Sequence, residues 1–320
     1  MSADLSIIIV NWNTRELLAE CLKSVDRSQA SGVRQQETEV FVVDNASSDG
    51  SAAMVRERFP WVRLITSPEN LGFAAGNNLA LRQATGKQIL LLNPDTVVVE
   101  GALARLWHLL AAHPTAGIAG AQLLNADGSQ QMSYGVFPSL WSELPVINRR
   151  LHPVRGTVQI DARDGSLTVQ AVDWVSGACL MIKREVVEAI GPLDESFWLY
   201  TEETDWCYRA RAASWDVLFV PQAQVYHLAR AASRQRFVST MLHFYQSRVR
   251  FVRKHHGPIQ AALVKDVLRV KAALWQRRPS RSPLHGAYPD LPQAEISPAY
   301  RQLAQALALP LSQYLAAGWR

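Results

Sequence analysis

The sequence contains few cysteines and no long apolar run. Its three cysteines, Cys21, Cys179 and Cys207, lack the close spacing of metal-binding clusters, which favours reduced thiols in a cytosolic protein. No apolar run approaches the roughly 20 residues that span a bilayer. The chain reaches the apolar stretch Leu5–Val10 without a basic region or cleavage site before it, so we expect no secretory signal. We therefore predict a cytoplasmic protein, with any membrane contact peripheral and on the inner face of the cell membrane.

A strong excess of charge of one sign is also absent. The chain has 33 Lys and Arg residues against 28 Asp and Glu residues, and much of the positive charge lies late in the sequence. This balance does not require a nucleic-acid partner, and we predict none. Hydrophobic residues make up 48% of the 320 residues, enough for a sizeable core in one domain, with or without an appendage.

Strands and helices alternate in the first hundred residues. The apolar pattern predicts buried strands at Leu5–Val10, Glu39–Val43, Trp61–Ile65 and Ile89–Leu92. Helices are expected at 14–25 and 52–59, and a third is expected after a glycine- and asparagine-rich turn at 70–78. Strands separated by helices of this length favour a parallel, doubly wound sheet.

The rest of the chain is less regular. Asn125–Asp164 carries scattered Pro, Gly and Arg residues and favours loops, whereas a later strand at Val217–Val220 is expected to end at Pro221. From about residue 234 the sequence becomes basic and helical. Helices are predicted at Phe237–Lys254 and Ile259–Trp275, followed by a Pro-rich linker at 279–298 and a short helix at 299–309.

Polar side chains follow the predicted early strands. Asn11 and Asn13 come after the first strand, Asp44 after the second, and Asp95 after the fourth. Ligands of open α/β sheets bind outside the carboxyl ends of the strands, so these side chains would share one rim. An acid there can hold a divalent cation or bind a sugar hydroxyl. An ordinary turn or helix cap is the alternative reading of each.

A second group combines three carboxylates with aromatic residues. Glu202, Glu203 and Asp205 lie within four residues, between Tyr200 and Trp206. Aromatic surroundings raise the pKa of a carboxyl group, which suits it to take a proton from a hydroxyl. Acids also favour a helix N-terminus, and that role could fall to Glu202 while Glu203 or Asp205 does chemistry.

His227 follows the strand that is expected to end at Pro221. Its imidazole could bind a metal or serve a structural purpose, and the residues alone leave both open.

Together these segments resemble the inverting A-fold glycosyltransferases of the family 2 type, especially their rhamnosyltransferase-like branch. They occur in the expected order over about residues 5–255 and are Ile7–Asn13, Val42–Ser51, Asn70–Ala74 with Asn77 and Asn78, Leu91–Asp95, Ser176–Ala178, and Glu202–Trp206 through His227. The resemblance implies an α/β protein: a GT-A type, doubly wound mixed sheet with flanking helices, plus a C-terminal helical extension.

The resemblance also implies roles for individual residues. Asp95 and His227 would hold Mg²⁺ or Mn²⁺, and Glu203 falls where the family places its catalytic base, with Glu202 and Asp205 as neighbouring candidates. Residues on the nucleotide-sugar side would be Asn11, Asn13, Asp44, Asn70, Gly72, Asn78, Asn93, Asp95, Gly177 and Ala178, and those on the acceptor side Trp174 and Trp206.

Two residues depart from the family pattern. Asn93 replaces the first acid of the usual metal motif, although asparagine is common there in the rhamnosyltransferase-like branch. The base is a glutamate rather than an aspartate, which leaves the choice between Glu202 and Glu203 open.

The implied activity is metal-dependent, inverting transfer of a sugar from a nucleoside-diphosphate sugar such as dTDP-L-rhamnose. The acceptor would be a hydroxyl of a bacterial surface glycan or a lipid-linked glycan, in cell-wall or polysaccharide biosynthesis. UDP-galactofuranose and a UDP-hexosamine are alternative donors. A non-catalytic carbohydrate- or nucleotide-binding module would be favoured if the positions of Asp95, Glu203 and His227 were vacant, and a nucleotidyltransferase would want a basic glycine loop near the first strand.

We expect the catalytic domain over residues 1–233, with a nucleotide-sugar-binding half at about 1–120 and an acceptor half at about 121–233. A basic helical extension over 234–278 and a Pro-rich linker with a short C-terminal helix over 279–320 would follow. The basic amphipathic stretch Ile259–Arg278 fits contact with an anionic membrane, and it fits equally well a helix that completes an oligomer.

Overall fold

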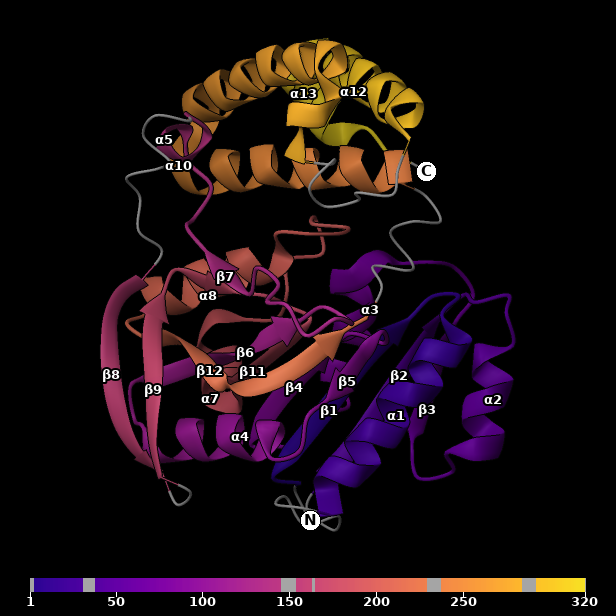
Figure 1. Cartoon of the computed structure of the whole chain (residues 1–320), viewed down its shortest axis with the longest axis vertical. Helices are drawn as coiled ribbons and strands as arrows, with labels where there is room; N and C mark the ends of the chain where they lie inside the picture. Colours follow the sequence, from indigo (N-terminus) through magenta and orange to yellow (C-terminus); the bar gives the residue numbers. More distant parts are fainter. Residues whose placement is uncertain are drawn as a thin grey trace. The chain divides into compact units, whose positions relative to one another are not determined.

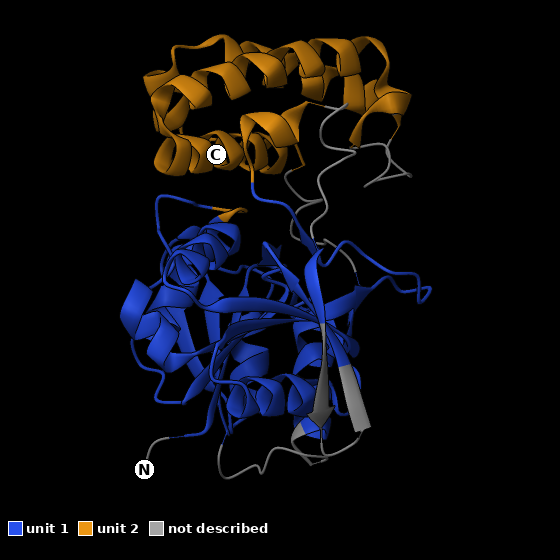
Figure 2. Cartoon of the chain, turned by 90° about the vertical axis from the view of Figure 1, so that its left-hand side faces the viewer, with its two compact units in different colours: residues 1–137, 152–198, 202–235 blue, residues 138–151, 199–201, 236–320 orange. Residues whose placement is uncertain are grey.

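The chain forms two compact units (Figure 2). The computed structural model describes residues 3–30, 38–144, 154–162, 165–228, 237–283 and 292–319. Unit 1 comprises Met1–Phe137, His152–Trp198 and Glu202–Gln235, and unit 2 comprises Pro138–Leu151, Leu199–Thr201 and Arg236–Arg320. The expected boundary at residues 233 and 234 and the middle of the expected Pro-rich linker lie outside the described residues.

Unit 1 is built on one mixed sheet (Figure 1). Its strands lie in the order β3-β2-β1-β4-β11-β6-β12-β9-β8, and β5 pairs with β12. Their bounds are β1 Leu5–Asn11, β2 Thr38–Asn45, β3 Arg63–Ser67, β4 Gln88–Leu92, β5 Thr96–Val98, β6 Ala116–Leu124, β8 Val154–Ala162, β9 Gly165–Val172, β11 Cys179–Lys183 and β12 Asp216–His227. β1 to β4 are parallel, whereas β11 runs antiparallel between β4 and β6. A separate pair joins β7 (Tyr134–Gly135) to β10 (Trp174–Val175).

Helices cover both faces of this sheet. On one face lie α1 (Arg15–Ala30), α2 (Ser51–Arg58) and α4 (Ala102–Ala112), and on the other lie α3 (Gly72–Leu81), α7 (Arg184–Ile190) and α8 (Glu202–Ala212).

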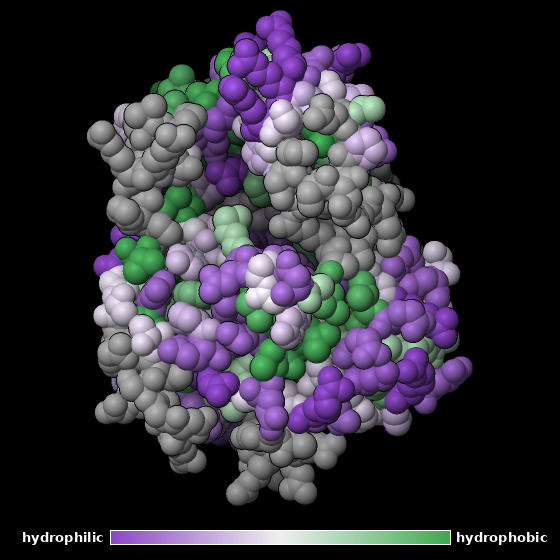
Figure 3. Space-filling view, viewed as in Figure 1, coloured by the Kyte–Doolittle hydropathy of each residue, from purple (hydrophilic) through white to green (hydrophobic). Residues whose placement is uncertain are grey.

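Successive residues of the central strands point to opposite faces of the sheet and so contribute to two hydrophobic cores, one on each face. Ile7 and Ile9 of β1 pack with α1, while Ile8 and Val10 pack with α3. A strand covered on both faces reads as a continuous apolar run, which is why the early strands were predictable. The outer surface visible in Figure 3 is largely hydrophilic, with smaller hydrophobic patches. The predicted α/β architecture with flanking helices is confirmed.

Four predictions about individual elements were wrong. The final helix was expected at 299–309, but α12 (Gln293–Ala308) begins inside the expected linker and includes Pro298. α3 begins at Gly72, inside the expected turn, and the Gly72 backbone N–H donates to the Asn70 side chain at 3.0 Å, which satisfies one of the free amides of the first helical turn. β12 continues past Pro221 to His227, because an irregularity between Val220 and Gln224 accommodates the proline. The supposed loop region at 125–164 contributes β8, which pairs with β9 at the edge of the main sheet.

Unit 2 is helical. It contains α5 (Leu140–Glu143), α10 (Phe237–Arg277), the short 3₁₀ helix η2 (Pro279–Arg281), α12 (Gln293–Ala308) and α13 (Leu311–Ala316). α10 is interrupted at Gly257, whose φ of 86° lies in the left-handed region, and its second half starts at Pro258. No helix among the described residues is both long enough and apolar enough to cross a membrane.

A buried ion cluster joins α5 to both halves of α10. Arg248 donates two hydrogen bonds to one carboxylate oxygen of Glu143, and Lys271 donates to the other at 3.0 Å. Burial alone would raise the pKa of the Glu143 carboxyl, but the two cations outweigh it and hold that pKa below its ordinary value. Glu143 therefore stabilises unit 2 in its ionised form.

We expect Glu143→Gln to destabilise α10 by about 2 kcal/mol at pH 7, because two cations lose their buried anion. The folded pKa of Glu143 is lowered, so its stabilisation is present above the unfolded value of 4.5 and is lost as the pH falls through the folded value. Hydrogen exchange of α10 amides at pH 7 and pH 3 in the full chain measures this. Asp266→Asn, at an exposed carboxylate, is the control and should lower the stability of α10 by less than about 0.5 kcal/mol. A Glu143→Gln loss as large at pH 3 as at pH 7 would contradict the assignment.

Candidate functional site

The carboxyl ends of β1 and β2 form the first polar cluster. The parallel register places Asn11 opposite Asp44. The side-chain amide of Asn11 donates to the Asp44 carboxylate at 3.3 Å and to the Ser47 hydroxyl at 3.1 Å. The Ser47 hydroxyl also accepts from the backbone N–H of Asn13 at 3.0 Å. The structure thus brings Asn11, Asn13 and Asp44 together. Ser47 joins them and had been given no role from the sequence.

The start of α3 lies beside this cluster. The buried Asn45 donates to the Asn70 side chain at 3.1 Å and to the Gly72 carbonyl at 3.0 Å, and it accepts from the Leu71 amide. Asn45 therefore ties Asn70 and Gly72 to the end of β2.

Gly72 is required by a protein contact rather than by the approach of a ligand. Its φ is +82°, and a Cβ added to it would lie 2.3 Å from the Trp198 carbonyl oxygen. The next residue, Phe73, donates its amide to that same oxygen at 2.8 Å. Trp198 is 36% exposed and had not been singled out from the sequence.

A second polar corner follows β4. His227 Nε2 lies 3.2 Å from the buried Asp95 carboxylate and 3.3 Å from the Asn93 amide nitrogen. Gln131 contacts the far side of the histidine, since its amide nitrogen donates to the His227 carbonyl at 2.8 Å and its oxygen lies 3.0 Å from Nδ1. The Asn93 backbone amide donates to the Ala178 carbonyl at 3.0 Å. Asn93, Asp95 and His227 thus meet beside the Ala178 carbonyl, and their role as a metal site stays a prediction.

Gln131 orients the His227 ring. Because the Gln131 nitrogen is used on a carbonyl, its oxygen is the atom that accepts the Nδ1 proton. In the neutral imidazole, Nε2 then carries the lone pair and faces Asp95 and Asn93. A histidine held in this way at one nitrogen is typical of a metal ligand at the other. The described residues contain no group of three or more His, Cys, Asp or Glu side chains placed around one ion. Further ligands would come from an amide, water or the bound substrate.

The start of α8 separates the three candidate carboxylates. Glu203 is half-buried, and its Cβ and Cγ would lie 3.4 and 3.5 Å from a Cβ added to Gly177, with the Phe73 ring at 3.7 Å. Glu203, Gly177 and the start of α3 therefore converge.

Glu202 is only 4% exposed, and its Oε2 has no hydrogen-bond partner. Burial, and secondarily the neighbouring Glu203 charge, raise the pKa of Glu202 well above its ordinary value. Burial therefore favours the neutral form of Glu202, whereas Glu203 is only half-buried. That Glu203 is the base stays a prediction.

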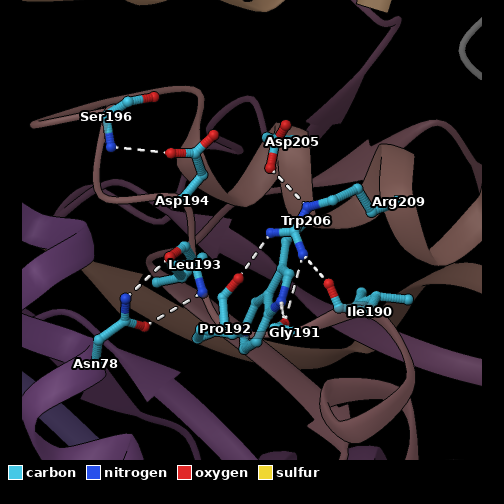
Figure 4. Close-up of polar contacts among 10 residues, drawn as sticks. All are labelled: Asn78, Ile190, Gly191, Pro192, Leu193, Asp194, Ser196, Asp205, Trp206 and Arg209. Atoms are coloured by element: carbon cyan, nitrogen blue, oxygen red, sulfur yellow. Dashed lines mark hydrogen bonds and ion pairs between the residues drawn. The ribbon is translucent and has the colours of Figure 1, made fainter. Parts of the chain in front are cut away.

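Two predicted site residues on α8 point into the core. Trp206 is fully buried and donates its indole N–H to the Gly191 carbonyl at 2.9 Å, so the prediction that it lines the acceptor side was wrong (Figure 4). Asp205 is 0% exposed and forms an ion pair with Arg209 at 2.8 Å, which removes it as a candidate base. Glu202, Asp205 and Trp206 have i, i+3, i+4 spacing, so they share one buried helix face, and the half-buried Glu203 lies at its edge.

The same core contacts hold the segment that precedes α8. Arg209 donates to the carbonyls of Ile190 and Pro192, and Asn78 forms two hydrogen bonds with the backbone of Leu193 (Figure 4). Asn78 is 1% exposed, so the prediction that it contacts the nucleotide sugar was also wrong.

Trp174 is half-buried, with its N–H donated to the Val136 carbonyl at 2.9 Å and its ring over Gly135. Its place on the acceptor side stays a prediction.

The site residues missed from the sequence differ in the signal they gave. Arg209 follows Asp205 at i+4 spacing, which indicates an ion pair on a helix. Gln131 gave no local signal, because its partner His227 is 96 residues away. Trp198 likewise meets Gly72 only through the tertiary fold.

Comparison with known proteins places this geometry in a family. The model of the family described as "Glycosyl transferase family 2" matches residues 6–191. The N-acetylglucosaminyl-diphospho-decaprenol L-rhamnosyltransferase of Mycobacterium tuberculosis is 26% identical over 264 residues, covering 77% of this chain and 84% of that protein. The low-salt glycan biosynthesis hexosyltransferase Agl10 of Haloferax volcanii is 31% identical over 225 residues, covering 66% of this chain and 62% of that protein.

Two solved structures share the fold. The mannosyltransferase PcManGT from Pyrobaculum calidifontis, in complex with GDP-Man and Mn²⁺, aligns with a TM-score of 0.53 and 18% identity over 99% of this chain and 86% of that chain. GalNAc-T7 with UDP, GalNAc and Mn²⁺ aligns with a TM-score of 0.59 and 16% identity, over 98% of this chain and 56% of that chain. At these identities the likeness establishes the fold alone, which is the predicted GT-A type.

We expect Gly72→Ala to destabilise unit 1 by more than Gly50→Ala, its matched control. Both glycines have a φ of +82°, but a Cβ on Gly50 meets nothing within 4 Å, whereas a Cβ on Gly72 meets the Trp198 backbone. Left-handed strain alone costs roughly 1 kcal/mol, so Gly50→Ala should lose about that much and Gly72→Ala at least about 2 kcal/mol. Thermal unfolding of the two variants measures the difference. An equal loss of stability in the two variants would show that Trp198 can shift away from a Cβ at position 72 without a cost in free energy.

Proposed function

This chain belongs to glycosyl transferase family 2, and we propose that it transfers L-rhamnose from dTDP-L-rhamnose to a hydroxyl of a bacterial surface glycan or lipid-linked glycan. That it is a glycosyltransferase follows from the family and from the activities in the names of its relatives. The observation that carries the finer proposal is the convergence of Glu203 with Gly177 and the start of α3, together with the Asp95–His227 corner.

The choice of donor and acceptor rests on similarity. The mycobacterial relative is named as a rhamnosyltransferase acting on a lipid-linked diphosphate. Asp44 lies at the rim where an open α/β sheet binds its ligand, and its carboxylate suits the edge of a nucleobase or a ribose. Asn11 is fully buried and supports Asp44 through its side-chain N–H.

The corner after β4 fits a divalent cation, Mg²⁺ or Mn²⁺. Asp95 supplies a carboxylate, His227 supplies an imidazole nitrogen whose partner nitrogen is held by Gln131, and Asn93 can turn its amide oxygen inward. When bound, such an ion would neutralise negative charge on the leaving nucleoside diphosphate. Asn93 carries no charge, so Asp95 is the anionic ligand of this corner.

Glu203 acts as the general base. It takes the proton from the acceptor hydroxyl, whose oxygen attacks the anomeric carbon from the face opposite the diphosphate as the anomeric C–O bond breaks. One such displacement inverts the anomeric centre without a covalent enzyme intermediate. Gly177 lies beside Glu203, and a Cβ added to it would come into ordinary contact with the Glu203 side chain.

Asp95→Ala should abolish metal-dependent transfer while leaving the fold intact, and it should remove Mn²⁺ binding measured by calorimetry in the presence of dTDP. Gln131→Leu should weaken that binding by about 10- to 100-fold, because His227 loses the partner that fixes its tautomer. Asp127→Asn, an exposed carboxylate that accepts from Ser129, is the matched control and should bind as the wild type does. Unchanged activity and Mn²⁺ affinity in Asp95→Ala would make the corner structural.

Glu203→Gln should lower kcat by about 10²- to 10⁴-fold with dTDP-L-rhamnose binding unchanged, because only the general base is lost. Glu202→Gln is the matched control: burial favours the neutral form of Glu202, so an uncharged amide of the same shape should leave kcat within a few-fold. Initial rates with dTDP-L-rhamnose, UDP-galactofuranose and a UDP-hexosamine also test the donor. A large loss in Glu202→Gln with activity retained in Glu203→Gln would reverse the assignment.

A further inference from the structure

The second half of α10 has two apolar faces. One is buried within unit 2 and consists of Ala261, Val264, Leu268 and Ala272. The other is exposed: Ile259 is 77%, Leu263 47%, Val270 58% and Leu274 56% accessible. We call these four side chains the exposed stripe.

The exposed stripe is a continuous surface. Its members follow one another at intervals of four, seven and four residues, which places them on one side of a helix with 3.6 residues per turn. That side lies roughly opposite the buried face. Among the described residues, seven large hydrophobic side chains are exposed, and four of them belong to this one segment. Single exposed apolar side chains are ordinary, but an aligned group marks an interaction site.

The charged residues near the stripe are mainly cationic. Over 258–283 the exposed charged side chains are Asp266 and four arginines, Arg269, Arg277, Arg278 and Arg281. The two lysines of the segment are used inside unit 2, since Lys265 donates to the Leu307 carbonyl at 2.7 Å and Lys271 to Glu143. The exposed surface of this segment therefore carries a net positive charge, which comes from arginines.

We propose that the exposed stripe rests on an anionic lipid surface, with its aliphatic side chains at the boundary of headgroups and acyl chains and its arginines on lipid phosphates. The stripe extends over about 22 Å of helix, and the described helices are unable to cross a membrane, so the segment would lie in the plane of the interface. The inference does not depend on the proposed sugar transfer.

Charge selects a lipid surface over a second copy of this chain. Two copies joined through the stripe would bring two arginine-rich rims together, which is unfavourable, whereas anionic headgroups complement the same rim. The proposal therefore takes the membrane side of the choice that the sequence left open for Ile259–Arg278.

The test is flotation of the full chain with phosphatidylcholine vesicles, with or without phosphatidylglycerol, at low and high salt. A stripe variant carries Ile259→Gln, Leu263→Gln, Val270→Gln and Leu274→Gln, because glutamine preserves helix propensity. Each lost aliphatic contact is expected to lower the membrane partition coefficient by up to about tenfold. The partition coefficient of the stripe variant should therefore be at least about a hundredfold lower than that of the wild type. Met132→Gln, which removes an equally exposed side chain from unit 1 (77%), is the matched control and should bind like the wild type.

A second variant removes charge while keeping the apolar surface. Arg269→Gln, Arg277→Gln and Arg278→Gln together should lower binding to phosphatidylglycerol vesicles by about a hundredfold, at about fivefold per arginine, and should abolish its salt dependence. This variant keeps the proposal testable if the stripe variant does not fold, as judged by circular dichroism.

Two outcomes would overturn the proposal. One is the absence of wild-type binding to anionic vesicles at low salt, or binding equal in the wild type and both variants. The other is a wild-type dimer in light scattering that becomes monomeric in the stripe variant without any vesicle binding, since the stripe would then bind a second copy. Neither result bears on Glu203 or Asp95, so failure here is distinct from failure of the proposed transfer.

Discussion

The candidate site depends on the parallel register of β1 with β2 and β4. These strands are buried on both faces, so hydrophobic burial fixes their register, and their common direction brings their carboxyl ends to one rim. Asn11 therefore lies opposite Asp44, and Asn93 follows β4 at the same edge. β11 then enters antiparallel beside β4 and brings the Ala178 carbonyl to the Asn93 amide. A slip of one residue in any of these pairings would move polar ends into the core.

The position of Glu203 depends on buried residues of α3 and α8. The segment before α8 is held by Asn78 from α3 and by Arg209 and Trp206 from α8 itself. Arg209 is in turn fixed by the buried Asp205, whose carboxylate would be costly in the core without it. In the same way, Gln131 orients the His227 ring through its contact with Nδ1. Glu203 and His227 thus lie on segments that are held by hydrogen bonds to other parts of the fold.

The sequence predicted most of the sheet and most of the rim. Continuous apolar runs indicated β1, β2 and β4, because a doubly covered strand has no polar face, and polar residues after them indicated Asn11, Asp44 and Asp95. It failed for Asn78, Asp205 and Trp206. All three belong to segments with the right composition for a ligand site, but composition does not say which side of a helix meets the core. The spacing of Glu202, Asp205 and Trp206 carried that information in part, since it puts these three on one helix face and Glu203 at its edge.

In unit 2 the basic, helical character of α10 could be read from the residues, but not which of its apolar faces is covered. Packing within the unit buries one face and leaves the stripe from Ile259 to Leu274 exposed. The same division holds for the whole protein. The sequence by itself determined the alternation of strands and helices, the family, and the residues at the strand ends, because these follow from local periodicity and motif order. Only the tertiary structure decided which carboxylate is buried, which tryptophan lies in the core and which glutamine orients His227, because burial and long-range hydrogen bonds arise only when distant segments pack.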